Sequence, residues 1–288
     1  MAPVSSEGHA SDVSLFAVDF DETISVEDTI SRLPQLAAKH RTNSGRRDML
    51  NEWKCAAEDY YETRRRILAE ALGDIQPTED PRDGLVALSD AFRSLETSSL
   101  DAVEEGGFLR GIRRDELERS CGDVVLKDEA LDVLTSAASL GLPVHVVSVN
   151  WSADLIRAAI GDVDAAVHSS DLVFNSDGVS TGELDRRMVS AVDKQRCLRE
   201  LRQDDGSMIF VGDGVTDLLA LLEADVGILI GGNADAITTC RHFGVPLRPL
   251  ASSGHLDACD VEFDDAFDGL YVAKTWREIR QATLGHCR

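Results

Sequence analysis

The chain has little positive charge for its length. Its 288 residues include 29 Lys and Arg against 52 Asp and Glu, which gives a formal net charge of −23 at pH 7. Nucleic acids and anionic membranes require a basic footprint, so both are excluded as main partners. A small phosphorylated substrate is compatible with this charge, because a few local cations, backbone amides and a metal ion can outweigh the overall field.

The sequence also lacks long apolar runs and cysteine pairs. No apolar stretch approaches the roughly 18–20 residues of a transmembrane helix. Residues 1–12 are small and polar, without the apolar centre of a signal peptide, and predict a flexible N-terminal tail. The cysteines show no CxxC pair and no framework spacing, which is typical of free thiols in a reducing compartment, and we expect a cytoplasmic protein. They are Cys55, Cys121, Cys197, Cys240, Cys259 and Cys287.

Short apolar segments alternate with helical segments along most of the chain. This alternation predicts an α/β fold with a doubly wound parallel sheet and right-handed crossovers. The predicted strands are Leu15–Phe20, Val144–Val149, Met208–Val211, Val226–Ile230, Val245–Leu247 and Leu270–Val272. The predicted helices between them are Lys127–Leu140, Ser152–Ile160, Ala191–Arg202, Thr216–Glu223 and Ala234–Phe243.

Residues 26–125 break this pattern, because they carry almost no strand signal. Apolar side chains recur there at helical spacing and predict a long amphipathic helix: Met49, Trp53, Ala56, Tyr60 and Ile67. A turn is expected between Pro77 and Pro81. We therefore predict a helical cap domain at 26–125, inserted into a core domain formed by 13–25 and 126–288.

The segment Asp19-Phe20-Asp21-Glu22-Thr23 directly follows the first apolar strand. A strand that ends in two carboxylates can aim both beyond its carboxyl end, where open α/β sheets bind ligands. One carboxylate could attack a substrate while its neighbour handles a proton, and the backbone between them could turn toward a metal. The alternative, about equally compatible with this segment alone, is that the acidic residues form a turn or cap a helix.

A second acidic pair lies in Phe210-Val211-Gly212-Asp213-Gly214-Val215-Thr216-Asp217. The glycines allow a sharp bend, and Asp217 in the first helical turn would face back toward Asp213. Carboxylates from two adjacent strand ends would repel one another without a cation between them, which favours Mg²⁺ with oxygen ligands. The alternative is an ordinary strand–turn–helix link with Asp217 as a favourable first-turn charge.

Two further residues have weaker signals. Ser148 ends the strand in Val146-Val147-Ser148-Val149-Asn150-Trp151, where a hydroxyl and the free amides of a helix N-terminus could hold phosphate. Lys194 stands near the start of a helix, where a cation requires a nearby anion or open solvent. Taken singly, Ser148 is typical of a simple strand end and Lys194 of a solvated surface.

The order of these four motifs resembles the haloacid dehalogenase (HAD) superfamily of aspartyl-phosphate phosphohydrolases, and the helical insert resembles its C1 cap. The resemblance implies a Rossmann-like core and phosphate monoester hydrolysis, with Asp19 as nucleophile and Asp21 as acid/base. It implies Mg²⁺ on Asp19, the main-chain carbonyl of Asp21, Asp213 and Asp217. It also implies phosphate binding by Ser148, Asn150, Lys194 and Gly214, with Asn150 and Gly214 contributing their backbone amides.

A closer resemblance links the core to the phosphatase domain of plant and fungal thiamine monophosphate phosphatases. It rests on Val144–Ser148 with Trp151, on Val211-Gly212-Asp213 with Asp217-Leu218-Leu219, and on Leu270-Tyr271-Val272 with Trp276. It implies thiamine monophosphate or a similar small cationic metabolite as substrate. Asp28 stands where C1-capped relatives similar to phosphoserine phosphatase place an acidic residue against a substrate cation. Trp53, Tyr60 and Tyr61 on the cap helix could stack on an aromatic cation. The aromatic residues could instead pack in the cap core. A phosphoserine-type or other small-metabolite phosphatase, and a non-catalytic phosphate sensor or scaffold, remain alternatives.

Overall fold

The computed structural model describes residues 13–202, 206–250 and 267–284. The segment 1–12, for which the sequence predicts a flexible tail, lies outside the described residues. In the described part of the chain, no helix combines the length and the apolar character needed to cross a membrane.

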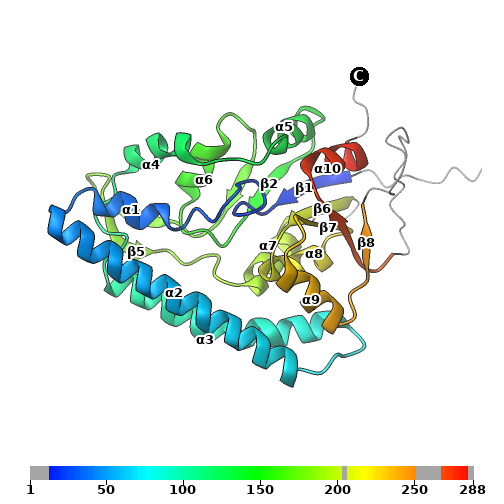
Figure 1. The fold of residues 1–288 in the computed structure, drawn as a ribbon. Coiled ribbons are helices and arrows are strands. Elements are labelled where there is room, and N and C mark those ends of the chain that lie inside the picture. Colours follow the sequence, from blue (N-terminus) through cyan, green and yellow to red (C-terminus); the bar gives the residue numbers. More distant parts are fainter. Residues whose placement is uncertain (1–12, 203–205, 251–266, 285–288) are drawn as a thin grey trace, which may run out of the picture.

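A seven-stranded sheet forms the centre of the molecule (Figure 1), and its spatial order is β3-β2-β1-β6-β7-β9-β8. All neighbouring strands are parallel, which confirms the predicted doubly wound fold. The strands are β1 (Val13–Val18), β2 (Val144–Val147), β3 (Ala166–His168), β6 (Ser207–Gly212), β7 (Val226–Ile230), β8 (Leu247–Pro249) and β9 (Leu270–Ala273).

The alternating side chains of β1 divide the hydrophobic core into two layers. Phe16 and Val18 pack on one face of the sheet, whereas Leu15 and Ala17 pack on the other. The first layer is covered by α5 (Ala130–Ser139), α6 (Ala153–Ile160) and α10 (Trp276–Thr283). The second layer is covered by α7 (Ala191–Leu201), α8 (Leu218–Glu223) and α9 (Ala234–His242).

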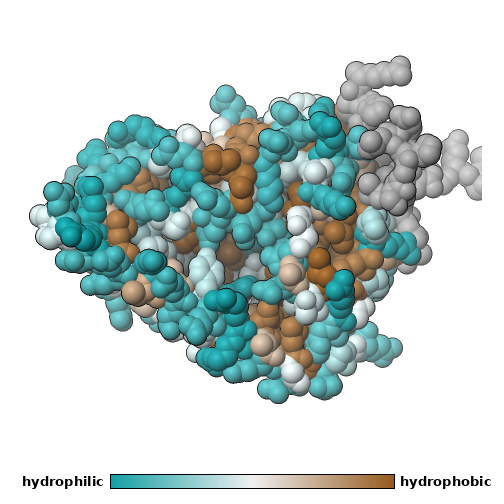
Figure 2. Space-filling view, viewed as in Figure 1, coloured by the Kyte–Doolittle hydropathy of each residue, from teal (hydrophilic) through white to brown (hydrophobic). Residues whose placement is uncertain are grey.

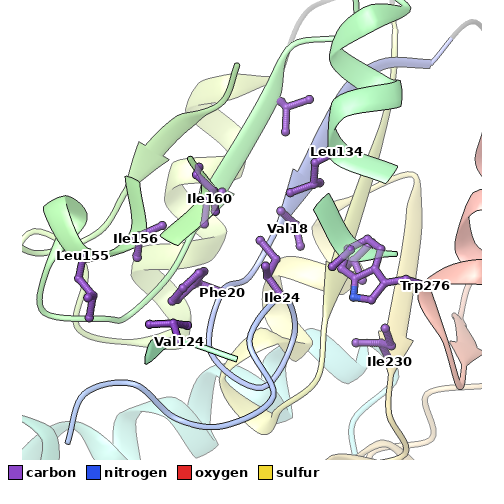
Figure 3. Close-up of a cluster of buried hydrophobic side chains, with 14 of the residues drawn as sticks. Val18, Phe20, Ile24, Val124, Leu134, Leu155, Ile156, Ile160, Ile230 and Trp276 are labelled. Atoms are coloured by element: carbon purple, nitrogen blue, oxygen red, sulfur yellow. The ribbon is translucent and has the colours of Figure 1, made fainter. Parts of the chain in front are cut away.

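Trp276 anchors the segment that follows β1. Figure 3 shows it beside Val18, Ile24 and Ile230 in the first layer. Its buried indole N–H donates a hydrogen bond to the carbonyl of Thr23 at 2.9 Å. The indole therefore satisfies a buried backbone acceptor at the last residue of the Asp19–Thr23 segment and holds that segment against the sheet.

Residues 26–125 are mainly helical, as the sequence predicts for this stretch. Its helices are α1 (Arg32–Ala38), α2 (Asn43–Asp74), α3 (Pro81–Glu105) and α4 (Arg114–Ser120), followed by a 3₁₀ turn at Cys121–Asp123. The long amphipathic helix is confirmed as α2. The predicted turn lies between α2 and α3, where Asp80 caps α3 by accepting from the Arg82 N–H at 2.9 Å.

Several elements were not predicted or differ from their predicted bounds. An antiparallel hairpin of β4 (Leu172–Phe174) and β5 (Ser180–Leu184) and the edge strand β3 carry too few consecutive apolar residues for a sequence signal. Helix α10 was missed although its start has a local signal, since Thr275 accepts from the Glu278 N–H as an N-cap. The strand predicted at Val245–Leu247 lies instead at β8. The helix predicted from Thr216 begins as a 3₁₀ turn at Val215–Asp217 before α8.

Candidate active site

The sequence motifs meet at the carboxyl ends of three neighbouring strands. Val18, the last residue of β1, pairs with Val146 of β2 on one side and Val211 of β6 on the other. Asp19, Ser148 and Asp213 therefore leave the sheet at the same edge, close to its centre. Parallel strands place their exits together in this way, and the sequence alone anticipates it.

Three buried carboxylates form the acidic centre of the site. One oxygen from each of Asp19, Asp213 and Asp217 lies within 4.8 Å of the others. Burial raises the pKa of Asp19 well above its ordinary value, with Lys194 opposing and the other two carboxylates adding to the effect. Burial, together with Asp217 and Glu22, raises the pKa of Asp213 to about 7. The centre thus carries more negative charge than its surroundings compensate.

Lys194 is completely buried and bridges two of these carboxylates. Its Nζ donates to Asp19 Oδ1 at 2.7 Å and to Asp217 Oδ1 at 2.6 Å. Burial alone would lower the pKa of Lys194, but the two carboxylates outweigh burial and hold it above its ordinary value. Of the two sequence-based alternatives for this lysine, a nearby anion or open solvent, the structure has the nearby anion.

Asp217 is held by the turn between β6 and α8, of which it is part. Its Oδ2 accepts the backbone N–H groups of Asp213 at 3.0 Å and Gly214 at 2.9 Å. A Cβ on Gly212 would lie 2.6 Å from the Asp217 side chain, so this close approach requires glycine. Thr23 donates to Asp213 Oδ1 at 3.1 Å, which fixes the third carboxylate from the β1 side.

Asp21 points toward the start of the helical insert, where three donors hold it. Thr29 donates to Oδ1 through its N–H at 2.8 Å and its hydroxyl at 2.7 Å, and Asn150 Nδ2 donates to Oδ2 at 2.7 Å. Burial, followed by the charge of Asp28, raises the pKa of Asp21 to about 6 against the lowering effect of these bonds. Sequence analysis missed both donors: Thr29 lies eight residues after Asp21 in an irregular segment without a sequence signature, and Asn150 lies 129 residues away, beyond any local pattern.

The backbone amides expected to bind phosphate have protein partners in this structure. The Asn150 N–H donates to the hydroxyl of buried Ser148 at 3.2 Å, and the Gly214 N–H donates to Asp217. Ser148 itself lies at the predicted strand exit and lines the same cavity as Asp19 and Asp213. Phosphate binding by Ser148, Asn150, Lys194 and Gly214 stays a prediction.

A cavity of about 730 Å³ extends from this acidic centre to the helices α2 and α3. Figure 2 shows apolar side chains set back in a hollow between these helices and the core, within a largely hydrophilic face. The four residues predicted to contact the substrate from the cap all line the cavity: Asp28, Trp53, Tyr60 and Tyr61.

The cap residues also contact one another. Tyr61 donates its hydroxyl to Asp28 Oδ2 at 2.8 Å, and Oδ1 accepts the Ile30 N–H at 2.8 Å. The ring of Trp53 stands edge-on to Phe108 and Trp151, at centroid distances of 5.7 and 6.1 Å. Trp53 therefore packs against aromatic neighbours and faces the cavity as well, so both roles considered for it stay open.

Comparison with known proteins gives one family and several relatives. A family model described as haloacid dehalogenase-like hydrolase matches residues 13–225. The chain is 27% identical to the bifunctional TH2 protein, mitochondrial, of Arabidopsis thaliana over 97% of this chain and 50% of that protein. It is 27% identical to the CTO1 family protein C17G9.12c of Schizosaccharomyces pombe over 94% of this chain and 99% of that protein.

The fold has a counterpart among solved structures. A HAD family hydrolase from Salmonella enterica subsp. enterica serovar Typhi superposes with a TM-score of 0.54 at 16% identity. The superposition covers 80% of this chain and 66% of that one. At this identity the likeness concerns the fold alone.

Proposed function

The chain belongs to the haloacid dehalogenase-like hydrolase family, and from this premise we propose that it is a Mg²⁺-dependent phosphate monoester hydrolase with an aspartyl-phosphate intermediate. The observation that carries the proposal is the buried group of Asp19, Asp213 and Asp217 with Lys194 between two of them. A carboxylate nucleophile beside a buried cation, at the floor of a cavity, suits attack on an anionic phosphorus centre.

The proposed reaction has two steps. Asp19 attacks phosphorus, an O–P bond to Asp19 forms, and the ester O–P bond breaks while Asp21 gives its proton to the departing alkoxide. Asp21 then takes a proton from water as that water attacks phosphorus, which releases phosphate and restores Asp19. Ser148 and Lys194 would bind the non-bridging oxygens, and Thr29 and Asn150 would orient Asp21 between the steps.

The residues present fit a divalent cation with oxygen ligands. The burial of three carboxylates, with a pKa of about 7 for Asp213, indicates uncompensated negative charge that a cation would relieve. Asp19, Asp213 and the main-chain carbonyl of Asp21 would hold Mg²⁺, and Asp217 would support it. When bound, the ion would neutralise part of the phosphate charge.

Residues 26–125 would act as a cap domain and determine the leaving group, because the core motifs serve only the phosphate. We propose thiamine monophosphate or a similar small cationic metabolite as substrate. The similarity to the Arabidopsis TH2 protein supports this choice, as do Asp28 and the aromatic rings in the cavity. The chain spans half the length of that relative, so the activity of the whole relative is carried over only as a proposal.

A phosphoserine-type substrate is the second candidate. Arg64 of α2 lines the cavity together with Asp28, and such a pair could bind the carboxylate and the ammonium of an amino acid. For the compartment we propose the cytoplasm, which suits the free thiols of Cys55, Cys197 and Cys240.

Purified protein with Mg²⁺ should be assayed on thiamine monophosphate, phosphoserine and 4-nitrophenyl phosphate, alongside Asp19→Asn. The wild type should hydrolyse all three to some extent, with the highest kcat/KM for thiamine monophosphate. A folded Asp19→Asn variant should lose turnover on every ester, since its shape is kept and the nucleophile is lost. A higher kcat/KM for phosphoserine would select the second candidate. Phosphate binding by a folded wild type without any turnover would favour a sensor or scaffold.

A further inference from the structure

Glu96 of α3 is an acidic side chain in the active-site cavity that neither the sequence motifs nor the proposed chemistry uses. It lines the cavity together with Asp28, Tyr60 and Tyr61. Among the described residues, none is recorded as a hydrogen-bond or ion-pair partner of its carboxylate, and its pKa responds only to burial and to charges at a distance. Partial burial removes some of the water around a carboxylate, and without a hydrogen bond or ion pair in the protein this loss of hydration costs free energy.

The charges that face Glu96 come from three helices. Arg64 of α2 and Arg93 of its own helix favour the ionised carboxylate, whereas Asp193 of α7 opposes it. Neither arginine is free to neutralise it fully, because Arg64 lies over the Phe92 ring at 5.2 Å and Arg93 donates to Asp90 at 2.5 Å. Burial prevails over these charges and raises the pKa of Glu96 to about 7.

Tyr60 lines the cavity together with Glu96 and Asp28. Burial raises the pKa of the Tyr60 hydroxyl, and the charges of both Glu96 and Asp28 add to this effect while Arg64 opposes it. Glu96 comes from α3 and Asp28 from the segment after β1, and both line the same cavity as Tyr60. Tyr61 stands edge-on to Tyr60 at 5.4 Å and donates to Asp28. Two carboxylates and two aromatic rings thus share one part of the cavity wall.

We propose that Glu96 is a specificity-determining residue that, together with Asp28, binds the positively charged leaving group of the substrate. This inference rests on the proposed phosphatase function. Aromatic faces and carboxylates together favour a delocalised or quaternary organic cation, because such an ion is weakly hydrated and stacks on rings. The partnerless carboxylate would receive its counter-ion only from the substrate.

Binding of such a cation should release a proton. Below about pH 7 the empty cavity holds Glu96 largely as the neutral acid, and a bound cation stabilises the ionised form. The folded-state pKa is raised without the cation and falls when the cation binds, so affinity should increase as pH rises through about 7. A neutral leaving group would not show this increase.

The test compares thiamine monophosphate with 3-deazathiamine monophosphate, in which a neutral thiophene replaces the thiazolium ring. The ratio of their kcat/KM values should be measured with Mg²⁺ from about pH 5.5 to about pH 8.5. Both esters share the phosphate, the aminopyrimidine and the catalytic core, so the titrations of Asp19, Asp21 and Asp213 cancel in the ratio. For the wild type the ratio should exceed one and rise roughly tenfold across this range.

Three variants complete the design. Glu96→Gln should lower the ratio roughly tenfold or more at high pH and abolish its rise with pH, while turnover of the deaza ester is kept. Glu96→Asp should retain part of the rise. Glu105→Gln, at the exposed last position of α3, removes the same charge away from the cavity and should behave as the wild type.

Each contrary result has a distinct meaning. A ratio that does not change with pH in the wild type, or that rises equally in Glu96→Gln, overturns the role of Glu96. Equal losses on both esters in Glu96→Gln would make the residue structural. Hydrolysis of 4-nitrophenyl phosphate without preference for the thiazolium ester overturns the cation preference and leaves the phosphatase standing. Failure to hydrolyse any of the three esters overturns the proposed function itself.

Discussion

Lys194 and Asn150 illustrate how single residues organise this site. Each contacts a carboxylate that lies far away in the sequence: Lys194 reaches Asp19 across 175 positions, and Asn150 reaches Asp21 across 129. Both are essentially inaccessible to solvent. Their contributions therefore come from charge and hydrogen bonding in a low-dielectric interior, where an unmatched group is costly.

Replacing Lys194 by Met should destabilise the protein by about 3–5 kcal/mol, because Asp19 and Asp217 would remain buried without their shared counter-ion. Urea denaturation of the metal-free protein measures this loss. Lys54→Met is the matched control, since Lys54 forms an exposed ion pair with Glu58 and should cost less than about 1 kcal/mol. Equal losses in the two variants would contradict a special role for the buried bridge.

Replacing Asn150 by Ala should lower kcat roughly tenfold with little change in KM, because Asp21 loses one of the donors that orient it. Stability should fall as well, by about 1–3 kcal/mol, since Asn150 also contacts Thr29 and Ser152. Assays on 4-nitrophenyl phosphate separate kcat from KM, and Asn51→Ala on the exposed face of α2 is the control. An unchanged kcat in a destabilised Asn150→Ala would restrict Asn150 to a structural role.

At the scale of elements, α3 is one of the helices that pack the insert against the core, here against α7 and α8. Its first turn packs on Phe243, which follows α9, and Arg82 donates to the Leu222 carbonyl at 2.7 Å. The same helix carries Glu96 to the cavity further along. The packing of its N-terminal turn therefore bears on the position of a cavity-lining side chain more than three turns away.

Two glycines in the insert test this contact with opposite expectations. A Cβ at Gly84 would lie 2.4 Å from the Phe243 ring, so Gly84→Ala should cost about 1–3 kcal/mol through overpacking, less the gain in helix propensity. Gly73 of α2 has nothing within 4 Å of such a Cβ, so Gly73→Ala should stabilise by about 0.5–1 kcal/mol. The Tm values of the two variants measure these effects. A higher Tm for Gly84→Ala would show that the Phe243 ring can move to accommodate the added methyl group.

At the scale of the whole molecule, charge dominates. A net charge of −23 repels itself and repels an anionic substrate, and the buried acidic centre concentrates that repulsion at the cavity floor. A bound divalent cation would therefore affect both folding stability and activity, because it would bind the folded acidic centre but not the dispersed carboxylates of the unfolded chain.

Chelation with EDTA should abolish hydrolysis, and Mg²⁺ should restore it. Mg²⁺ at about 100 times its Kd should stabilise the folded protein by about 2.7 kcal/mol, which calorimetry detects as a higher Tm. Potassium chloride at matched ionic strength controls for general screening of the negative charge. Asp213→Asn should lose the Mg²⁺ effect yet melt no lower than the metal-free wild type, because it removes a buried charge that its neighbours oppose. A full Mg²⁺ effect in Asp213→Asn would place the cation elsewhere.

The sequence by itself determined the architecture of the catalytic half and the residues at its centre. Short apolar runs followed directly by a polar residue predict β1, β2 and β6, and apolar side chains at helical spacing predict α2. Both signals arise from residues that are close together in the sequence. The polar residues at the strand ends were therefore predictable as one group, since parallel strands expose their carboxyl ends at the same edge.

Only the tertiary structure decided which donors hold Asp21, which carboxylate Tyr61 binds, and that Glu96 reaches the cavity with no hydrogen-bond or ion-pair partner among the described residues. The edge strand β3 and the hairpin of β4 and β5 were likewise invisible in the sequence. The physical reason is the same in each case. These features depend on contacts between segments far apart in the chain, and the free energy of such contacts comes from packing and charge that no local window contains.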